Sequence, residues 1–178
     1  LRPGQTIVEA STGNTALALA LVAKQRGYKM KVVVPTMATP GVADLLAMYD
    51  VEVIWCEPLA GMKGAIDLAK GLAREEGGFA PCQFENQANV LAHYETTGPE
   101  ILRTLPEIDV FIAGIGTGGT LMGVGQRLKE YNSEIRVLGV EPRAGDQLQG
   151  LRSLQEGFVP PLLDLGKLDG RFLVDSAT

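Results

Sequence analysis

Two short turns rich in glycine, serine and threonine could bind anions. Each lies between a predicted strand and a predicted helix, so its backbone amides stand at a helix N-terminus, where they attract negative charge. Hydroxyl and amide side chains add donors to the first turn, and glycines let the backbone of the second approach an oxyanion. The first predicts a carboxylate or phosphate site, and the second a phosphate site. Their residues are Ser11, Thr12, Gly13, Asn14 and Thr15, and then Gly114, Ile115, Gly116, Thr117, Gly118, Gly119 and Thr120.

The residue types alone leave two alternative roles open for these turns. Serine, threonine and asparagine are the usual helix caps, and tight packing of a helix on a strand explains one or two of the glycines. Gly114, Gly116 and Gly119 also satisfy the G-x-G-x-x-G pattern, and Glu141 ends the next predicted strand. This combination is typical of a nicotinamide-dinucleotide-binding Rossmann domain. That fold binds its pyrophosphate at one turn, however, and leaves the first turn without a role.

The elements that must position these turns alternate between strand and helix patterns. This alternation predicts an α/β fold with open parallel sheets and flanking helices. Thr97 and Glu100 have the spacing of a capping box at the start of a helix. Residues 145–178 have no sustained periodicity apart from an apolar triplet at 172–174, so most of that stretch is predicted to be a loop. Strands are predicted at 6–9, 32–35, 51–55, 110–113 and 136–140, with a weaker one at 82–84; helices are predicted at 15–26, 62–75, 99–105, 121–131 and from the Thr39-Pro40 pair to about 49.

Composition excludes several classes of function. The 178 residues have a net charge of −5 and no basic stripe, so nucleic-acid binding is not expected. The longest apolar run, 16–23, is far shorter than the roughly 20 residues that cross a bilayer. Cys56 and Cys82 form no metal-binding or redox pattern, and His93 is the single histidine, so no metal site is expected. A reducing cytoplasm is the expected location.

Seven motifs, taken in order, resemble the cysteine synthases (O-acetylserine sulfhydrylases), pyridoxal-phosphate enzymes of the β-replacement group. The motifs span nearly the whole chain: LRPG at 1–4, STGNT at 11–15, GY at 27–28, GMKG at 61–64, QF at 83–84, HYETTGPE at 93–100 and GTGGT at 116–120. The resemblance implies the two-domain fold of the fold-type II, tryptophan synthase β-like enzymes. Residues 1–86 would be the small N-terminal domain, incomplete at its start, and 87–178 the first part of the larger cofactor-binding domain.

The same resemblance assigns roles to residues of both turns. It implies that the cofactor phosphate binds at Gly116, Thr117, Gly118, Gly119 and Thr120, and that Asn14 contacts the ring hydroxyl of pyridoxal phosphate. The amino-acid carboxylate would be held by Ser11, Thr12, Gly13, Asn14 and Thr15, with Gln83 as a second contact. Without the resemblance, Gln83 is equally well explained as a polar residue that ends a strand. The implied reaction forms L-cysteine from O-acetylserine, or O-phosphoserine, and sulfide.

Departures from the family pattern limit what the chain is expected to do by itself. The family's Schiff-base lysine would stand before Leu1, and the serine that partners the pyridine nitrogen would stand beyond Thr178, so this chain alone is expected to be inactive. A truncated relative that acts only as a binding module is therefore an alternative. The resemblance further implies a homodimer and, in some members, a complex with serine acetyltransferase. The lysines present, none of them in a matching position, are Lys24, Lys29, Lys31, Lys63, Lys70, Lys129 and Lys167.

Overall fold

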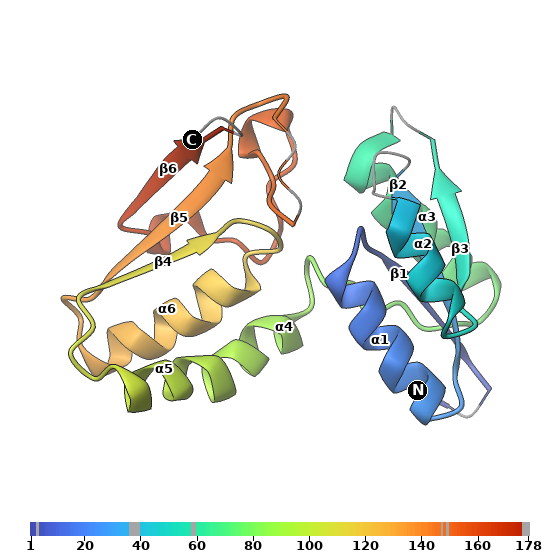
Figure 1. The fold of residues 1–178 in the computed structure, drawn as a ribbon, viewed down its shortest axis with the longest axis horizontal. Helices are drawn as coiled ribbons and strands as arrows, with labels where there is room; N and C mark the ends of the chain where they lie inside the picture. Colours follow the sequence, from blue (N-terminus) through green and yellow to red (C-terminus); the bar gives the residue numbers. More distant parts are fainter. Residues whose placement is uncertain (3, 36–39, 58–59, 147, 149, 176–178) are drawn as a thin grey trace. The chain divides into compact units, whose positions relative to one another are not determined.

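A computed structural model describes residues 1–2, 4–35, 40–57, 60–146, 148 and 150–175. The chain divides into two compact units, Leu1–Gln83 and Phe84–Thr178 (Figure 1). Each unit holds a parallel sheet of three strands with helices packed on it, which confirms the α/β fold class. The predicted cap Thr39 lies outside the described residues.

The first unit alternates strand and helix along its whole length. Its strands pair side by side in chain order, with Ile7 opposite Met30 and Val32 opposite Val53. Parallel strands covered on both faces are apolar at successive positions, and the Val32–Val34 run of three buried valines has this pattern. The elements are β1 (Thr6–Ala10), α1 (Asn14–Gln25), β2 (Lys29–Pro35), α2 (Pro40–Ala47), β3 (Glu52–Cys56) and α3 (Gly61–Glu75).

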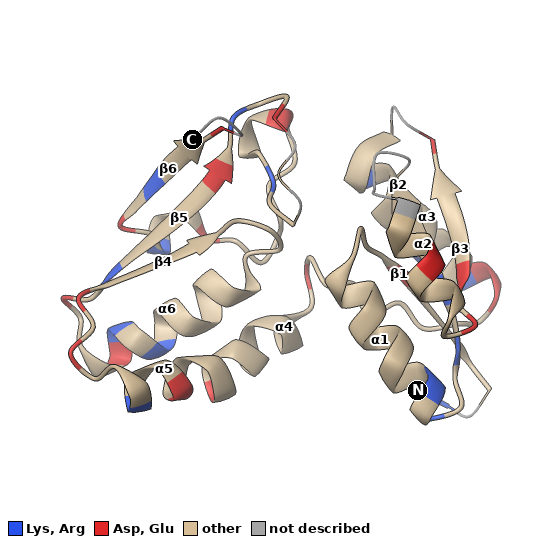
Figure 2. Cartoon of the chain, in the orientation of Figure 1, with Lys and Arg blue, Asp and Glu red and all other residues tan. Residues whose placement is uncertain are grey.

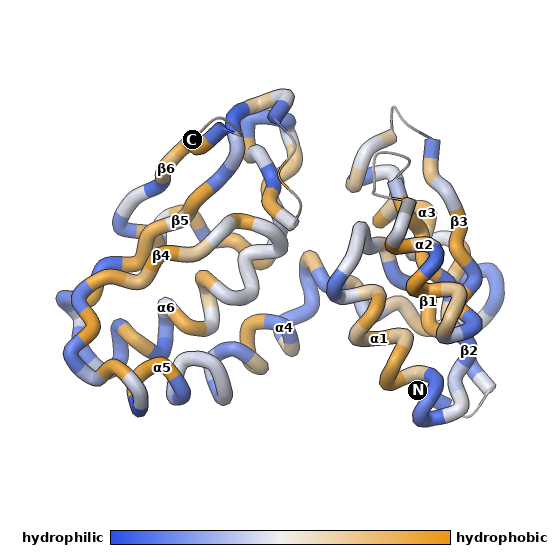
Figure 3. The backbone as a smooth tube through the Cα atoms, in the orientation of Figure 1, coloured by the Kyte–Doolittle hydropathy of each residue, from blue (hydrophilic) through white to orange (hydrophobic). Residues whose placement is uncertain are grey.

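Helices cover both faces of this first sheet. On one face, Ala20 of α1 and Leu46 of α2 share a buried cluster with Val32, and on the other, Ala69 of α3 shares one with Val8. In Figure 3, apolar colouring runs along α1 and through the middle of β3. The buried residues of α1 are three alanines, Ala16, Ala20 and Ala23, whose small side chains let the helix lie close to the sheet.

The second unit begins with helices and continues into a second parallel sheet, in which β4, β5 and β6 pair in that order. Leu121 of α6 and Val137 of β5 share one buried cluster, and α5 joins a second cluster through Ile101. The elements are α4 (Gln87–Ala92), the π-helix η2 (His93–Thr97), α5 (Gly98–Thr104), β4 (Val110–Gly114), α6 (Gly119–Tyr131), β5 (Arg136–Pro142), the 3-10 helices η3 (Leu154–Glu156) and η4 (Leu165–Lys167), and β6 (Gly170–Val174).

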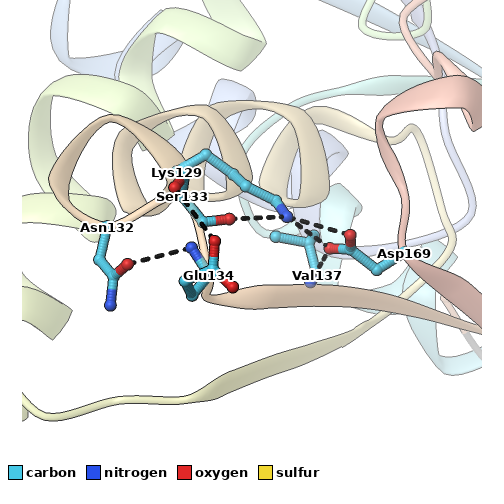
Figure 4. A network of polar contacts seen from close by, with 6 residues as sticks. All are labelled: Lys129, Asn132, Ser133, Glu134, Val137 and Asp169. Atoms are coloured by element: carbon cyan, nitrogen blue, oxygen red, sulfur yellow. Dashed lines mark hydrogen bonds and ion pairs between the residues drawn. The ribbon is translucent and has the colours of Figure 1, made fainter.

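A polar network fixes the far end of α6 against the start of β5 (Figure 4). The ammonium of Lys129 lies 2.8 Å from the carboxylate of Asp169, which also accepts the amide of Val137 at 2.7 Å. The hydrogen bond from Lys129, followed by that from Val137, holds the pKa of Asp169 below its ordinary value. Asp169, which lies just before β6, therefore binds both the end of α6 and the start of β5.

Most predicted elements are confirmed, with boundaries that move by one to three residues, and the triplet at 172–174 lies in β6. The strand predicted at 82–84 is wrong, because residues 83–85 form a turn and Cys82, just before it, has φ +57°. The predicted capping box is also wrong: Thr97 is itself helical, and its hydroxyl pairs with the ring of His93. The helical stretch over 87–97 was not predicted.

Charged residues of both signs are interspersed in both units (Figure 2). Among the described residues, no helix combines the length and the apolar character needed to cross a membrane.

Candidate functional site

The first turn connects β1 to α1, and the buried side chain of Ser11 holds it in shape. The Ser11 side chain is 3 % exposed, and its Oγ accepts the amides of Gly13 at 3.3 Å and Ala16 at 3.2 Å. The amide of Ser11 itself donates to the carbonyl of Val33 in the neighbouring strand. Ser11 therefore holds the shape of the turn, with the second amide of the pair already inside the first turn of α1.

Gln83 reaches the first turn from the other end of the unit. Its Oε1 accepts the hydroxyl proton of Thr15 at 2.8 Å, and its Nε2 donates to the carbonyl of Ala10 at 2.7 Å. The amide of Gln83 donates to the carboxylate of Glu9, which is 2 % exposed. The structure thus brings the Gln83 side chain together with the first turn.

Several donors of the first turn are open to a ligand. Within the described part of the chain, the amides of Thr12, Asn14 and Thr15 have no hydrogen-bond acceptor. The side chain of Asn14 is exposed, and those of Thr12 and Thr15 are half-buried. These amides stand at the positive end of a helix of 12 residues, which favours an anion.

The second turn connects β4 to α6 and is shaped by one left-handed residue. Gly118 has φ +89°, a conformation that favours glycine, and α6 begins at the next residue. The hydroxyl oxygen of Thr117 accepts the amide of Gly119 at 3.3 Å. Among residues that the structure describes, the amides of Thr117, Gly118 and Thr120 have no acceptor. Unpaired amides around a left-handed residue at a helix N-terminus fit a phosphate group.

The helical stretch over 87–97 fixes both threonine hydroxyls of the second turn. Asn89 of α4 donates from Nδ2 to the Oγ1 of Thr117 at 3.0 Å. In the π-helix, Nε2 of His93 pairs with the hydroxyl of Thr120 at 3.1 Å, and Nδ1 pairs with that of Thr97 at 3.0 Å. Burial lowers the pKa of His93, so the ring is held neutral with both nitrogens paired. Asn89 and His93 were not assigned to the site from the sequence.

The glycines of the second turn are required by packing to a greater extent than we expected. A Cβ at Gly114 would meet the Leu151 side chain, and one at Gly119 would meet the side chain of Asn89. At Gly116 it would lie 2.8 Å from the carbonyl of Gly150. Helix-on-strand packing was expected to explain one or two of these glycines, but the segment at 150–151 and α4 press against three of them. The support for a phosphate site thus comes from the unpaired amides.

Glu141 does not have the role that a Rossmann domain would give it. Its side chain is 4 % exposed, and its carboxylate accepts the amide of Leu154 at 2.7 Å and the guanidinium of Arg171 at 2.8 Å. Both oxygens accept hydrogen bonds inside the protein and the residue is almost fully buried, so Glu141 is not presented to a ribose hydroxyl. The nicotinamide-dinucleotide alternative is therefore not favoured.

Arg152 is a further residue beside the second turn that the sequence did not single out. Its amide donates to the carbonyl of Ile115 at 2.7 Å, and its guanidinium lies 5.3 Å and 5.2 Å from the ring centroids of Phe84 and Phe158. Burial lowers its pKa from the ordinary value, although an arginine stays charged. Arg152 thus places a partly buried positive charge close to the second turn, and its guanidinium lies near two aromatic rings.

Within the described ranges, no three His, Cys, Asp or Glu side chains gather so as to hold a metal ion. The donors of the two turns are amides, hydroxyls and side-chain amides, which suit oxyanions.

Known proteins are similar to this chain in sequence and in fold. The profile of the family described as "Pyridoxal-phosphate dependent enzyme" matches residues 2–167. Cysteine synthase B of Pseudomonas aeruginosa is 39 % identical over 170 residues, which are 95 % of this chain and 57 % of that protein. A cysteine synthase of Staphylococcus aureus is 41 % identical over 187 residues, covering 100 % of this chain and 60 % of that protein.

The chain is also similar to solved structures in fold. The crystal structure of O-ureido-L-serine synthase matches with a TM-score of 0.92 and 37 % identity, covering 100 % of this chain and 59 % of that one. The chain therefore spans about three-fifths of the length of the curated relatives that it matches. Matched over most of its length by the family profile, and similar to these relatives in sequence and fold, the chain belongs to the pyridoxal-phosphate-dependent enzymes.

Proposed function

We propose that these residues form the central part of a pyridoxal-phosphate-dependent enzyme that makes L-cysteine by β-replacement, from O-acetylserine or O-phosphoserine and sulfide. The observation that carries the proposal is the second turn, where the unpaired amides of Thr117, Gly118 and Thr120 lie beside two fixed hydroxyls. The cysteine synthase relatives support the choice of reaction.

On this proposal the second turn holds the cofactor phosphate. Its residues are Gly116, Thr117, Gly118, Gly119 and Thr120, of which Thr117, Gly118 and Thr120 supply the unpaired amides. Two threonine hydroxyls lie beside them, and the N-terminus of α6 adds its dipole. Charge-assisted hydrogen bonds of this kind contribute roughly 1.5–3 kcal/mol each before the costs of association. Asn14 is exposed at the start of α1, and we assign it to the ring hydroxyl of the cofactor.

The first turn holds the substrate carboxylate. Thr12, Asn14 and Thr15 offer unpaired amides, while Ser11 and Gly13 form the frame that presents them. Gln83 sits against the turn through Thr15, and its side-chain amide is the second carboxylate contact. Binding the carboxylate fixes the orientation of the amino acid at its α-carbon. When bound, pyridoxal phosphate supplies an electron sink for negative charge at that carbon.

The proposal assigns catalysis to a longer protein. The family's imine-forming lysine has no match among the seven lysines of the chain, so residues 1–178 supply binding and orientation. Residues 1–86 then belong to the small domain and 87–178 to the cofactor-binding domain. A homodimer in the cytoplasm, with serine acetyltransferase as a further partner, completes the proposal by family resemblance.

Ligand binding tests the phosphate site without requiring the lysine. Pyridoxamine phosphate lacks the aldehyde and so does not react with exposed lysines. It is expected to raise the melting temperature of the chain, because a ligand that binds only the folded state stabilises it. Inorganic phosphate should compete, and NAD should have no effect. Stabilisation by NAD alone would contradict the proposal.

Matched threonine variants locate the bound phosphate. Thr117→Val removes a hydroxyl of the second turn, whereas Thr104→Val removes an exposed one at the end of α5. Only the first is expected to weaken binding of pyridoxamine phosphate. Activity is then measured on the longest open reading frame that contains these residues, as cysteine formed from sulfide and either O-acetylserine or O-phosphoserine. A reading frame that binds the cofactor and forms no cysteine would support the binding-module alternative.

A further inference from the structure

We propose that Glu9 is a positioning residue for the carboxylate-binding turn, acting through Gln83 and Thr15. The inference rests on the proposed function, and it concerns a buried charge to which that function gives no role. Glu9 lies in β1, one residue before the strand ends, and the residue is 2 % exposed.

The carboxylate of Glu9 joins two segments that are far apart in the sequence. Its Oε1 accepts the amide of Ala10 at 3.0 Å, and its Oε2 accepts the amide of Gln83 at 3.2 Å. Gln83 then donates from Nε2 to the carbonyl of Ala10, at 2.7 Å. Glu9, Ala10 and Gln83 thus form a closed ring of hydrogen bonds at the carboxyl end of β1, and two of its bonds are charge-assisted.

This ring of hydrogen bonds fixes the position of Gln83 Oε1, the atom that contacts Thr15 of the first turn. Oε1 of Gln83 accepts the hydroxyl proton of Thr15, and Thr15 is the second residue of α1. Because Nε2 is tied to Ala10 and the backbone amide to Glu9, the Gln83 side chain has one orientation in which it can receive that hydroxyl. The unpaired amides of the first turn are therefore held in a fixed direction by a chain of hydrogen bonds that begins at Glu9.

The charge matters as well as the shape. A buried carboxylate is costly unless hydrogen bonds compensate for the water that it loses. Glutamine has the same shape, but it presents one acceptor oxygen and one NH₂ donor. In Glu9→Gln, the NH₂ group would face one of the two backbone amides, donor against donor, so either Ala10 or Gln83 must move.

A pair of ligands isolates the effect on the carboxylate. Phosphopyridoxyl-L-serine is a stable secondary amine that carries the phosphate, the ring and an amino-acid carboxylate, and pyridoxamine phosphate lacks the carboxylate. Neither requires a lysine. The ratio of their dissociation constants, measured by calorimetry on the same protein, is the gain from the serine part of the ligand, whose charged group is the carboxylate.

Glu9→Gln is expected to reduce this gain by about tenfold, the equivalent of one charge-assisted hydrogen bond, and to leave the affinity for pyridoxamine phosphate unchanged. Glu9→Asp keeps the charge and is expected to recover part of the gain. Glu141→Gln is the matched control, because Glu141 is equally buried near the end of a strand in the other unit and also accepts a backbone amide. Its gain is expected to equal that of the wild type.

The outcomes separate the two proposals. A wild-type chain that binds both ligands equally would overturn the carboxylate site and the role of Glu9 together. A normal wild-type gain that survives in Glu9→Gln would overturn the positioning role alone, even if the melting temperature falls, since a merely structural residue lowers stability without changing the ratio. If Glu9→Gln does not fold, the decision passes to Glu9→Asp, where an unchanged gain would count against the proposal.

Discussion

The hydroxyl of Thr15 donates a hydrogen bond to Oε1 of Gln83 over 2.8 Å, although 68 positions separate the two residues in the sequence. The bond connects the first turn of α1 to the last residue of the first unit. It also uses the side-chain proton of Thr15, so Thr15 offers a ligand its backbone amide and not its hydroxyl proton.

Gln83→Ala is expected to destabilise the first unit by about 1–2 kcal/mol. The substitution leaves the buried carbonyl of Ala10 without its side-chain donor, and an unsatisfied buried group costs free energy. Urea unfolding measures the change. Gln25→Ala is the control, because Gln25 is exposed at the end of α1 and should change stability by less than about 0.5 kcal/mol. Equal effects of the two substitutions would show that the bonds of Gln83 contribute little.

The elements nearest to the first turn could be predicted because their signals are local. β1 is mostly apolar and α1 has a continuous apolar middle, and their boundaries differ from the prediction by one residue. The turn at Gln83 could not be predicted in this way. Cys82 and Phe84 flank it with a strand-like alternation, and the left-handed Cys82 is accompanied by contacts from Gln83 to Glu9 and Ala10, which only the folded chain brings together.

The second turn shows a different limit of prediction from sequence. Asn86 caps α4 through the amide of Ala88, a signal that was present in the sequence, but the π-helix that follows interrupts the regular spacing on which helix prediction depends. Nor does a sequence distinguish a glycine needed for a ligand from one needed for packing. Gly116 and Gly119 are confined by Gly150 and Asn89, which meet them only in the folded structure.

Asn89→Ala is expected to weaken binding of pyridoxamine phosphate by about three- to tenfold. The variant removes the donor that holds the Thr117 hydroxyl oxygen, which corresponds to the loss of one hydrogen bond of about 1 kcal/mol. Asn132→Ala removes an exposed asparagine beyond α6 that caps the amide of Glu134, and it should leave the affinity unchanged. Isothermal calorimetry on both variants tests the difference, and an unaltered affinity in Asn89→Ala would mean that Thr117 needs no support from α4.

Two glycine-to-alanine substitutions inside helices are expected to have opposite signs. Gly71 lies in α3 with nothing within 4 Å of an added Cβ, so Gly71→Ala should stabilise the chain by about 0.5–1 kcal/mol through helix propensity. In α6, a Cβ at Gly123 would meet the carbonyl of Val90 and lie 2.8 Å from the Cβ of His93. Gly123→Ala should therefore destabilise the chain by about 1–3 kcal/mol. Thermal unfolding of both variants checks the signs, and stabilisation by both would contradict the close packing of α6 on α4.

His93, the one histidine of the sequence, is expected to make the stability of the folded chain depend on pH at and below about pH 6.5. Burial lowers its pKa below 6.5, so the unfolded chain binds the proton more readily than the folded one. The stability that depends on the neutral ring is fully present above about pH 6.5, and it is lost as the pH falls through the lower pKa of the folded state. Protonation also gives the ring a donor at both nitrogens, which face the hydroxyls of Thr97 and Thr120.

The test compares wild type with His93→Gln, because subtracting the variant removes the carboxylate titrations that both proteins share. The free energy of unfolding in urea is measured at about pH 7.5 and about pH 5.5, on either side of the ordinary histidine pKa. Wild type should lose more stability than the variant at the lower pH, and its affinity for pyridoxamine phosphate should fall as the Thr120 hydroxyl is reoriented. The chain has one histidine, so the difference belongs to this site. A wild type that gains stability relative to the variant at the lower pH would mean that the folded chain favours the charged ring, and that the neutral link between Thr97 and Thr120 is not what holds the second turn.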